Sequence, residues 1–128
     1  MGAAANEPGQ QFEPMKTVNL KQDFPTVQEA LSRLDREIAI ARKEGIALLK
    51  IVHGYGSSGV GGDIRLAVQA RLHHIAESGQ ISACIFGENW SKSDTTVWQL
   101  LQARAELKQD RDLGRGNRGI TVVVLCEH

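Results

Sequence analysis

Hydrophobic side chains recur along this chain in two patterns, amphipathic stretches and short continuous apolar runs. Between residues 27 and 41 apolar side chains stand three or four positions apart, which is the spacing of one helical face. Thr26 and Glu29 form a capping box before this stretch, and Gly45 follows it. The pattern therefore predicts a helix that begins after Thr26 and ends at Gly45.

Short apolar runs alternate with the helical stretches and predict four strands, at residues 17–21, 47–52, 81–86 and 120–125. A second helix is expected to begin beyond Gly62 and to end near Gly79, and a third to be capped by Ser93 or Asp94. The element order is βαβαβ(α)β. It predicts an α/β fold, a two-layer sandwich with a mostly parallel or mixed four-stranded sheet.

The composition of the chain is that of an ordinary globular protein, with 41% hydrophobic and 23% charged residues among 128. Residues 1–16 are small and polar and are expected to form a disordered leader before a domain at 17–126. No apolar run approaches the roughly 18 residues that span a bilayer. Cys84 and Cys126 fall in apolar runs and are expected to be buried reduced thiols. Together these features favour a cytoplasmic protein without a membrane partner.

A glycine-rich loop after the second strand is the strongest candidate for a functional site. The strand ends at His53, the loop opens into a helix, and Arg65 lies early in that helix. Such loops bind anions, because free backbone N–H groups and the helix dipole point to the same place. The spacing of Gly54, Gly56 and Gly59 also satisfies the dinucleotide fingerprint, but no acidic residue stands about 20 residues further on.

Two side chains of this region have open alternatives. His53 can act as an acid, a base, a metal ligand or a phosphate donor, or it can cap the strand and hydrogen-bond the loop. Arg65 lies in the first helical turn, where the dipole disfavours a cation, and a bound anion would offset that cost. Pairing with Asp63 is the alternative for Arg65.

The segment at 108–119 is rich in arginine and glycine and can follow a nucleic-acid backbone. Asp110 and Asp112 dilute its positive charge, so a flexible solvated connection is an equal alternative. The 15 basic and 15 acidic residues give no net charge, which argues against a strongly electrostatic nucleic-acid binder unless one face is basic. Trp98 is expected to anchor the third helix on the core, whereas the place of Trp90 is open.

Taken together, these motifs resemble the Smr domain, the small MutS-related module. The resemblance covers about residues 18–125 and rests on the stretches 26–30, 51–56, 62–68 and 119–125. It implies a two-layer α/β sandwich similar to the C-terminal domain of bacterial translation initiation factor three. It also implies nucleic-acid binding, since family members bind nucleic acid and several cleave DNA or RNA. Residues 87–115, with a helix, are then an insertion in place of a shorter connection.

The first family motif is altered. The family usually ends its first strand with L-D-x-H-G, where this chain has Asn19 for the acid and Lys21 for the histidine. Lys21 can bind a phosphate as a point charge, but it is a poor proton-transfer group at neutral pH. The second motif survives at His53, Gly54 and Gly56.

The resulting hypothesis is a nucleic-acid-binding Smr-like domain with a phosphate-binding HGxG loop, and the alternative is a non-catalytic protein-interaction module. If the domain is an endonuclease, His53 is its expected catalytic residue, and a divalent ion, Mg or Mn, its expected cofactor; no residue is assigned to a metal. The residues expected to bind nucleic acid are Lys21, Gly54, Tyr55, Gly56, Ser57, Ser58, Gly61, Gly62, Arg65, Arg115 and Arg118.

Overall fold

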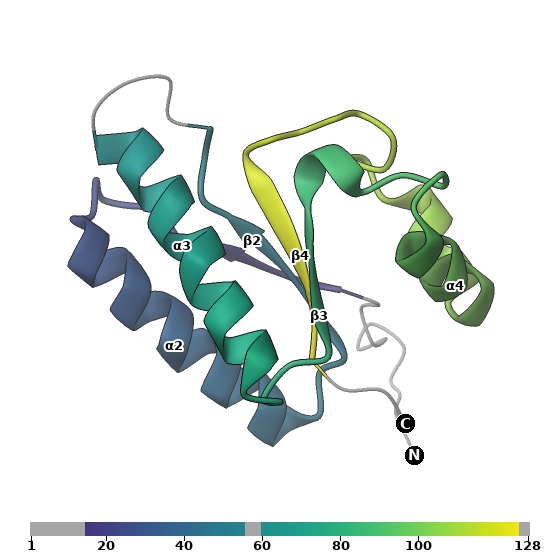
Figure 1. Ribbon diagram of the computed structural model, residues 1–128, viewed down its shortest axis with the longest axis horizontal. Coiled ribbons are helices and arrows are strands. Elements are labelled where there is room, and N and C mark those ends of the chain that lie inside the picture. The colour runs from purple at the N-terminus through teal and green to yellow at the C-terminus, as the bar shows by residue number, and fades with distance from the viewer. Residues whose placement is uncertain (1–14, 56–59, 126–128) are drawn as a thin grey trace, which may run out of the picture.

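The computed structural model describes residues 15–55 and 60–125, with the backbone alone for Val60 and Gly61. Its elements follow the predicted order (Figure 1). They are β1 (Lys16–Asn19), α2 (Val27–Glu44), β2 (Leu48–Val52), α3 (Val60–Glu77), β3 (Ala83–Phe86), the 3-10 helix η2 (Gly87–Asn89), α4 (Thr95–Ala103), the 3-10 helix η3 (Ala105–Gln109) and β4 (Ile120–Val124).

The four strands form one sheet in the order β1-β2-β4-β3. The pairing of β1 with β2 is parallel, and β4 pairs antiparallel with both β2 and β3. The sheet is therefore mixed, as predicted. β1, β2 and β3 all run in one direction, so their carboxyl ends meet the amino end of β4 at a single edge of the sheet.

Helices α2 and α3 lie side by side on one face of the sheet (Figure 1). The predicted capping box begins α2, with the Thr26 hydroxyl accepting from the Glu29 N–H at 3.1 Å and the Glu29 carboxylate accepting from the Thr26 N–H at 2.9 Å. Ala30, Leu34 and Ile38 of α2 are buried against the sheet, as their spacing predicts. The sheet and these two helices form the two-layer sandwich that the sequence predicts.

The opposite face of the sheet is covered by α4 and η3, so the segment 87–115 adds a partial further layer (Figure 1). A second apolar cluster forms there from Leu48 and Val122 of the sheet and Leu101 of α4, among others. Because side chains are buried on both faces, β2 and β4 are apolar almost throughout instead of alternating. No helix within the described residues is long and apolar enough to cross a membrane.

Trp98 does not have the place expected for it, and Trp90, whose place was left open, is the buried tryptophan. Trp90 is fully buried in the second cluster, and its Nε1 donates to Asp110 at 2.9 Å. Trp98 is 51% exposed, because its neighbours Val97, Leu100 and Leu101 form the apolar side of α4. The expectation for Trp98 was wrong because the buried stripe of α4 falls one position away from it.

The starts of α3 and β1 differ from the sequence expectations. α3 begins at Val60 and not beyond Gly62, so two glycines lie in its first turn. At the amino end, Met15 is buried in the second cluster and Lys16 opens β1, within the stretch expected as a leader. Cys84 is a free, half-buried thiol, and Cys126 lies outside the described residues.

Candidate nucleic-acid interface

Five of the residues predicted to bind nucleic acid, Lys21, Gly54, Tyr55, Arg65 and Arg118, lie where the strands end. We call this region the carboxyl edge: the segment after β1 (20–26), the segment after β2 (53–55), the first turns of α3, η2, and residues 117–119 before β4. The sheet register places Asn19 beside Val52, Val52 beside Ile120, and Phe86 beside Thr121. Segments that are distant in the sequence therefore meet here.

Lys21 and Gly54 are in direct contact at this edge. Gly54 has a φ of +80°, and a Cβ added to it would lie 2.9 Å from Cδ of Lys21. The Lys21 side chain thus lies along the Gly54 backbone, and the residue itself is exposed. Asn19 holds the turn beneath it, because its Oδ1 accepts from the Lys21 N–H at 2.8 Å. Asn19 and Lys21, the two altered positions of the first motif, therefore form a turn that places the Lys21 side chain against Gly54.

His53 lies below this surface, with 1% of its area exposed. Its Nδ1 is 2.9 Å from the Gly54 carbonyl, which can only accept, so Nδ1 carries the proton. In the neutral ring Nε2 then accepts from the Thr121 hydroxyl, 2.9 Å away. Burial lowers the pKa of His53 below its ordinary value of 6.5, and the charge of Arg65 acts in the same direction. His53 is thus a neutral side chain that links the loop to β4.

Tyr55 lies between two arginines on the surface of the edge. The guanidinium carbon of Arg65 is 5.4 Å from the centre of the Tyr55 ring, and that of Arg118 is 5.7 Å from it. Arg118 also donates from Nη1 to the Tyr55 hydroxyl at 3.2 Å. Tyr55 is 48% exposed, so the cluster is open to solvent on one side. Among the described residues, no carboxylate forms an ion pair with Lys21, Arg65 or Arg118.

Other predicted residues are not part of this cluster. Gly56, Ser57 and Ser58 lie outside the described residues. Gly61 and Gly62 lie in the first turn of α3, inside the helix rather than in a loop. Arg115 is exposed in the segment before β4, and no contact of its side chain joins it to Tyr55. The structure therefore brings together Lys21, Gly54, Tyr55, Arg65 and Arg118.

A buried polar network supports the segment that carries Arg118, and the sequence did not reveal it. Lys50 of β2 is 6% exposed, and its Nζ lies 2.6 Å from Oδ1 of Asp110 and 2.6 Å from Oδ2 of Asp112. Burial alone would raise the pKa of Asp112, but hydrogen bonds from Lys50 and Asn117 and the Lys50 charge outweigh it and lower that pKa. The segment is anchored, not a flexible solvated connection.

The same network reaches the glycine loop through Asn117. Its Nδ2 donates to Asp112 at 3.0 Å, and its Oδ1 accepts from the Gly119 N–H at 2.8 Å. The Gly119 carbonyl in turn accepts from the N–H groups of His53 and Gly54, each at 3.0 Å. A lysine in the middle of an apolar strand, with two aspartates in one later segment, is the signal that could have pointed to this network.

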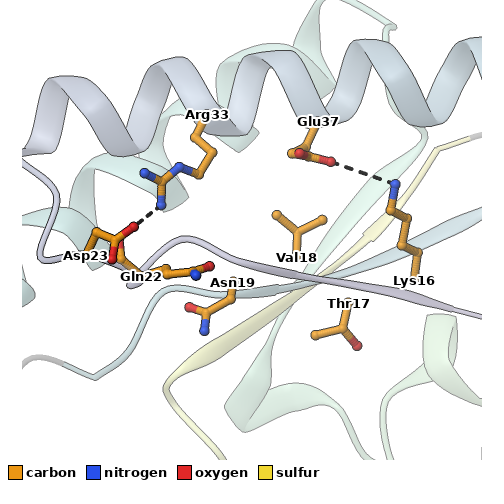
Figure 2. A pocket seen from close by; sticks show the side chains of 8 residues that line it. All are labelled: Lys16, Thr17, Val18, Asn19, Gln22, Asp23, Arg33 and Glu37. Atoms are coloured by element: carbon orange, nitrogen blue, oxygen red, sulfur yellow. Dashed lines mark hydrogen bonds and ion pairs between the residues drawn. The ribbon is translucent and has the colours of Figure 1, made fainter.

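A pocket of about 550 Å³ lies beside the carboxyl edge, between β1 and α2 (Figure 2). It is lined by residues of both charges, and none of the predicted site residues lines it. Lys16 in this pocket lies 3.8 Å from the Glu37 carboxylate. Within the described part of the chain, no group of three or more His, Cys, Asp or Glu side chains could hold a metal ion.

Comparison with known proteins gives a structural relative. The chain is similar to the Smr domain of Thermus thermophilus MutS2, with a TM-score of 0.55 and 24% sequence identity over 88% of this chain and 99% of that one. No protein-family model and no curated protein matches the chain. At this identity the likeness concerns the fold. The chain therefore has an Smr-like α/β fold, as its sequence resemblance predicts.

Proposed function

We propose that the carboxyl edge binds the backbone of a nucleic acid, DNA or RNA. The observation that carries the proposal is the placement of Tyr55 between Arg65 and Arg118, with Lys21 on the adjacent turn. Like charges brought together repel one another, and no carboxylate within the described residues compensates for them by an ion pair. Bound phosphates would remove that repulsion, because each phosphate supplies a negative charge and hydrogen-bond acceptors.

Arg65 supports this proposal in a second way. Its Nε is enclosed without a hydrogen-bond partner in the part of the chain that the structure describes, so a phosphate would be bound by the two Nη groups. An arginine that stacks on an aromatic ring keeps other N–H groups for a ligand. The Smr-like fold adds support, since the family it resembles binds nucleic acid, and the protein is proposed to do so in the cytoplasm.

Fluorescence anisotropy with labelled oligonucleotides, measured over a range of salt concentrations, tests the proposal. Lys21→Ala and Arg65→Ala are each expected to weaken binding and to reduce the slope of log K against log salt by about 0.7 to 0.9. Lys43→Ala is the matched control, because Lys43 is an exposed cation in the last turn of α2, at the other end of the helix. Unchanged affinity in both Lys21→Ala and Arg65→Ala would contradict the proposal.

Cleavage of nucleic acid with His53 as the catalytic residue stays a prediction, and it requires a change in the hydrogen bonds of His53. Both ring nitrogens make internal hydrogen bonds, so one must open before His53 can transfer a proton to or from a phosphodiester. Glu88 of η2 is the carboxylate whose charge acts on His53. A denaturing gel with magnesium or manganese, comparing wild type with His53→Ala, tests whether His53 supports cleavage. Equal cleavage by the two proteins would remove His53 from the mechanism.

The exposed Trp98 favours a second candidate function, a protein-interaction module. Trp98 is 51% exposed on α4, on the opposite side of the sheet from α2 and α3. Trp98→Ala separates the two candidates: nucleic-acid affinity should be unchanged, whereas a partner bound through α4 should be lost. Weaker nucleic-acid binding by Trp98→Ala would place the interface elsewhere than the carboxyl edge.

A further inference from the structure

We propose that Phe24 stacks on a base, and that the ligand of the carboxyl edge is therefore a nucleic acid with an unpaired base. This inference rests on the proposed function. It specifies which class of nucleic acid the carboxyl edge binds and which side chain selects that class.

Phe24 is almost completely in water. It is 98% exposed, whereas Leu66, the next most exposed large hydrophobic side chain in the described residues, is 60% exposed. An aromatic ring with nearly all its surface in solvent gains little from folding, because hydrophobic stabilisation follows the area removed from water. Packing within the fold therefore does not account for this side chain.

The backbone that presents the ring is unusual. Asp23 has a φ of 65° and Phe24 a φ of 48°, so two consecutive non-glycine residues lie in the left-handed region. Bulky side chains rarely adopt this conformation, because Cβ then approaches the following carbonyl oxygen. A turn of this kind persists only where its surroundings hold it.

Contacts on both sides hold the turn. Arg33 reaches from α2 to the turn, where its Nη1 donates to the Gln22 carbonyl at 3.2 Å (Figure 2). On the other side Pro25 is buried, and Thr26 begins α2 with its capping box. The Phe24 ring is thus an exposed group on an anchored turn.

The turn lies beside the cations of the proposed interface. Phe24 follows Lys21 by three residues, and the Lys21 side chain lies along Gly54. Because β1 and β2 are adjacent and parallel, the Phe24 turn and Tyr55 leave neighbouring strands at the same edge. Exposed aromatic rings beside basic side chains are the combination that binds single strands, with rings on bases and cations on phosphates.

The geometry favours an unpaired base over continuous duplex. Inside a duplex both faces of a base are covered by its neighbours, so an aromatic ring must wedge two base pairs apart at an energetic cost, whereas an unpaired base offers its face without that cost. Asp23 places a negative charge on the same turn, which disfavours phosphate there. We therefore expect phosphates on the Lys21 side and a base against Phe24.

Anisotropy titrations with a single-stranded oligonucleotide and with the blunt duplex of the same sequence test the inference. Phe24→Ala is expected to weaken binding to the single strand by roughly 5- to 150-fold, the range of one base–aromatic stack, and to leave duplex binding unchanged. Phe24→Trp is expected to restore the affinity, because it keeps a ring. Parallel DNA and RNA probes show which sugar the site accepts.

A 2-aminopurine in the single strand gives a readout of the contact itself. Its fluorescence should fall when wild type or Phe24→Trp binds, and change less with Phe24→Ala. Unchanged single-strand affinity in Phe24→Ala, or an equal loss on both probes, would overturn the inference. If Lys21→Ala weakens binding while Phe24→Ala does not, the proposed function stands and the inference fails. If wild type binds neither probe, both fail.

Discussion

Gly87 and Asn117 approach so closely that no side chain fits between them. A Cβ added to Gly87 would lie 1.8 Å from the Asn117 carbonyl oxygen and 2.8 Å from Cγ1 of Ile120. The backbone of η2 thus supports the segment that carries Arg118 and Gly119. Through Gly119, whose carbonyl accepts from the N–H groups of His53 and Gly54, this contact connects η2 to the residues that follow β2.

Gly87→Ala is therefore expected to destabilise the protein by about 2 to 3 kcal/mol, because the Asn117 backbone must move. The same movement should weaken nucleic-acid binding by displacing Arg118 from Tyr55. Urea unfolding and anisotropy measure the two effects, with Asn89→Ala as the control at an exposed, uncharged residue of the same 3-10 helix. A Gly87→Ala protein with the stability of wild type would contradict this account, because it would show that the Asn117 backbone moves without a loss in the free energy of unfolding.

Lys50→Met is expected to destabilise the protein by about 3 kcal/mol. The change removes the ammonium group that pairs with both Asp110 and Asp112, whose side chains are 13% and 17% exposed. Lys16→Met is the matched control, since Lys16 is a lysine of the neighbouring strand with 38% of its side chain exposed and longer ion pairs. Adding Asp110→Asn and Asp112→Asn to Lys50→Met should recover part of the loss. A loss no larger than that of Lys16→Met in urea unfolding would contradict this account.

The sequence was sufficient for those parts of the fold that depend on local chemistry. The Thr26 and Glu29 capping box and the end of α2 at Gly45 were predicted, because the groups that satisfy a helix end lie within a few residues of it. The sheet face of α2 was predictable for the same reason. The resemblance to the Smr domain then gave the expected fold.

Contacts between distant residues could not be predicted from spacing. Lys50 and Asp112 are 62 residues apart, and Tyr55 and Arg118 are 63 apart. Periodicity describes one element at a time, so it could not show which arginine would meet Tyr55. It also misplaced Trp98, because neighbouring positions of α4 lie on different sides of the helix, so Val97 is buried and Trp98 is exposed. Arg65 was singled out for its place in the first helical turn, but its stacking on Tyr55 was not foreseen.

The burial of His53 makes the stability of the protein depend on pH in a defined direction. Its folded-state pKa lies below the ordinary value of 6.5 that applies when the chain is unfolded. As the pH falls through about 6.5 the unfolded chain takes up a proton that folded His53 does not, so stability falls until the folded pKa is passed. His53→Gln cannot take up that proton, so its stability should change less between about pH 7.5 and about pH 5. Parallel slopes for wild type and His53→Gln in urea unfolding would contradict this role.

Phe24→Gly should stabilise the protein while weakening its binding to single strands. A left-handed conformation costs a bulky residue about 1 to 2 kcal/mol, which glycine avoids. Glycine loses about 0.5 to 1 kcal/mol more conformational entropy on folding, so a net gain of up to about 1.5 kcal/mol is expected. Phe24→Ala keeps the strain and serves as the control, because it should lose binding without gaining stability. Thermal and urea unfolding measure the stability, and single-strand anisotropy measures the binding. A Phe24→Gly protein that is less stable than wild type would mean that the Phe24 ring supports the turn. A Phe24→Gly protein that is more stable but binds single strands more weakly would show that the ring serves binding and not folding.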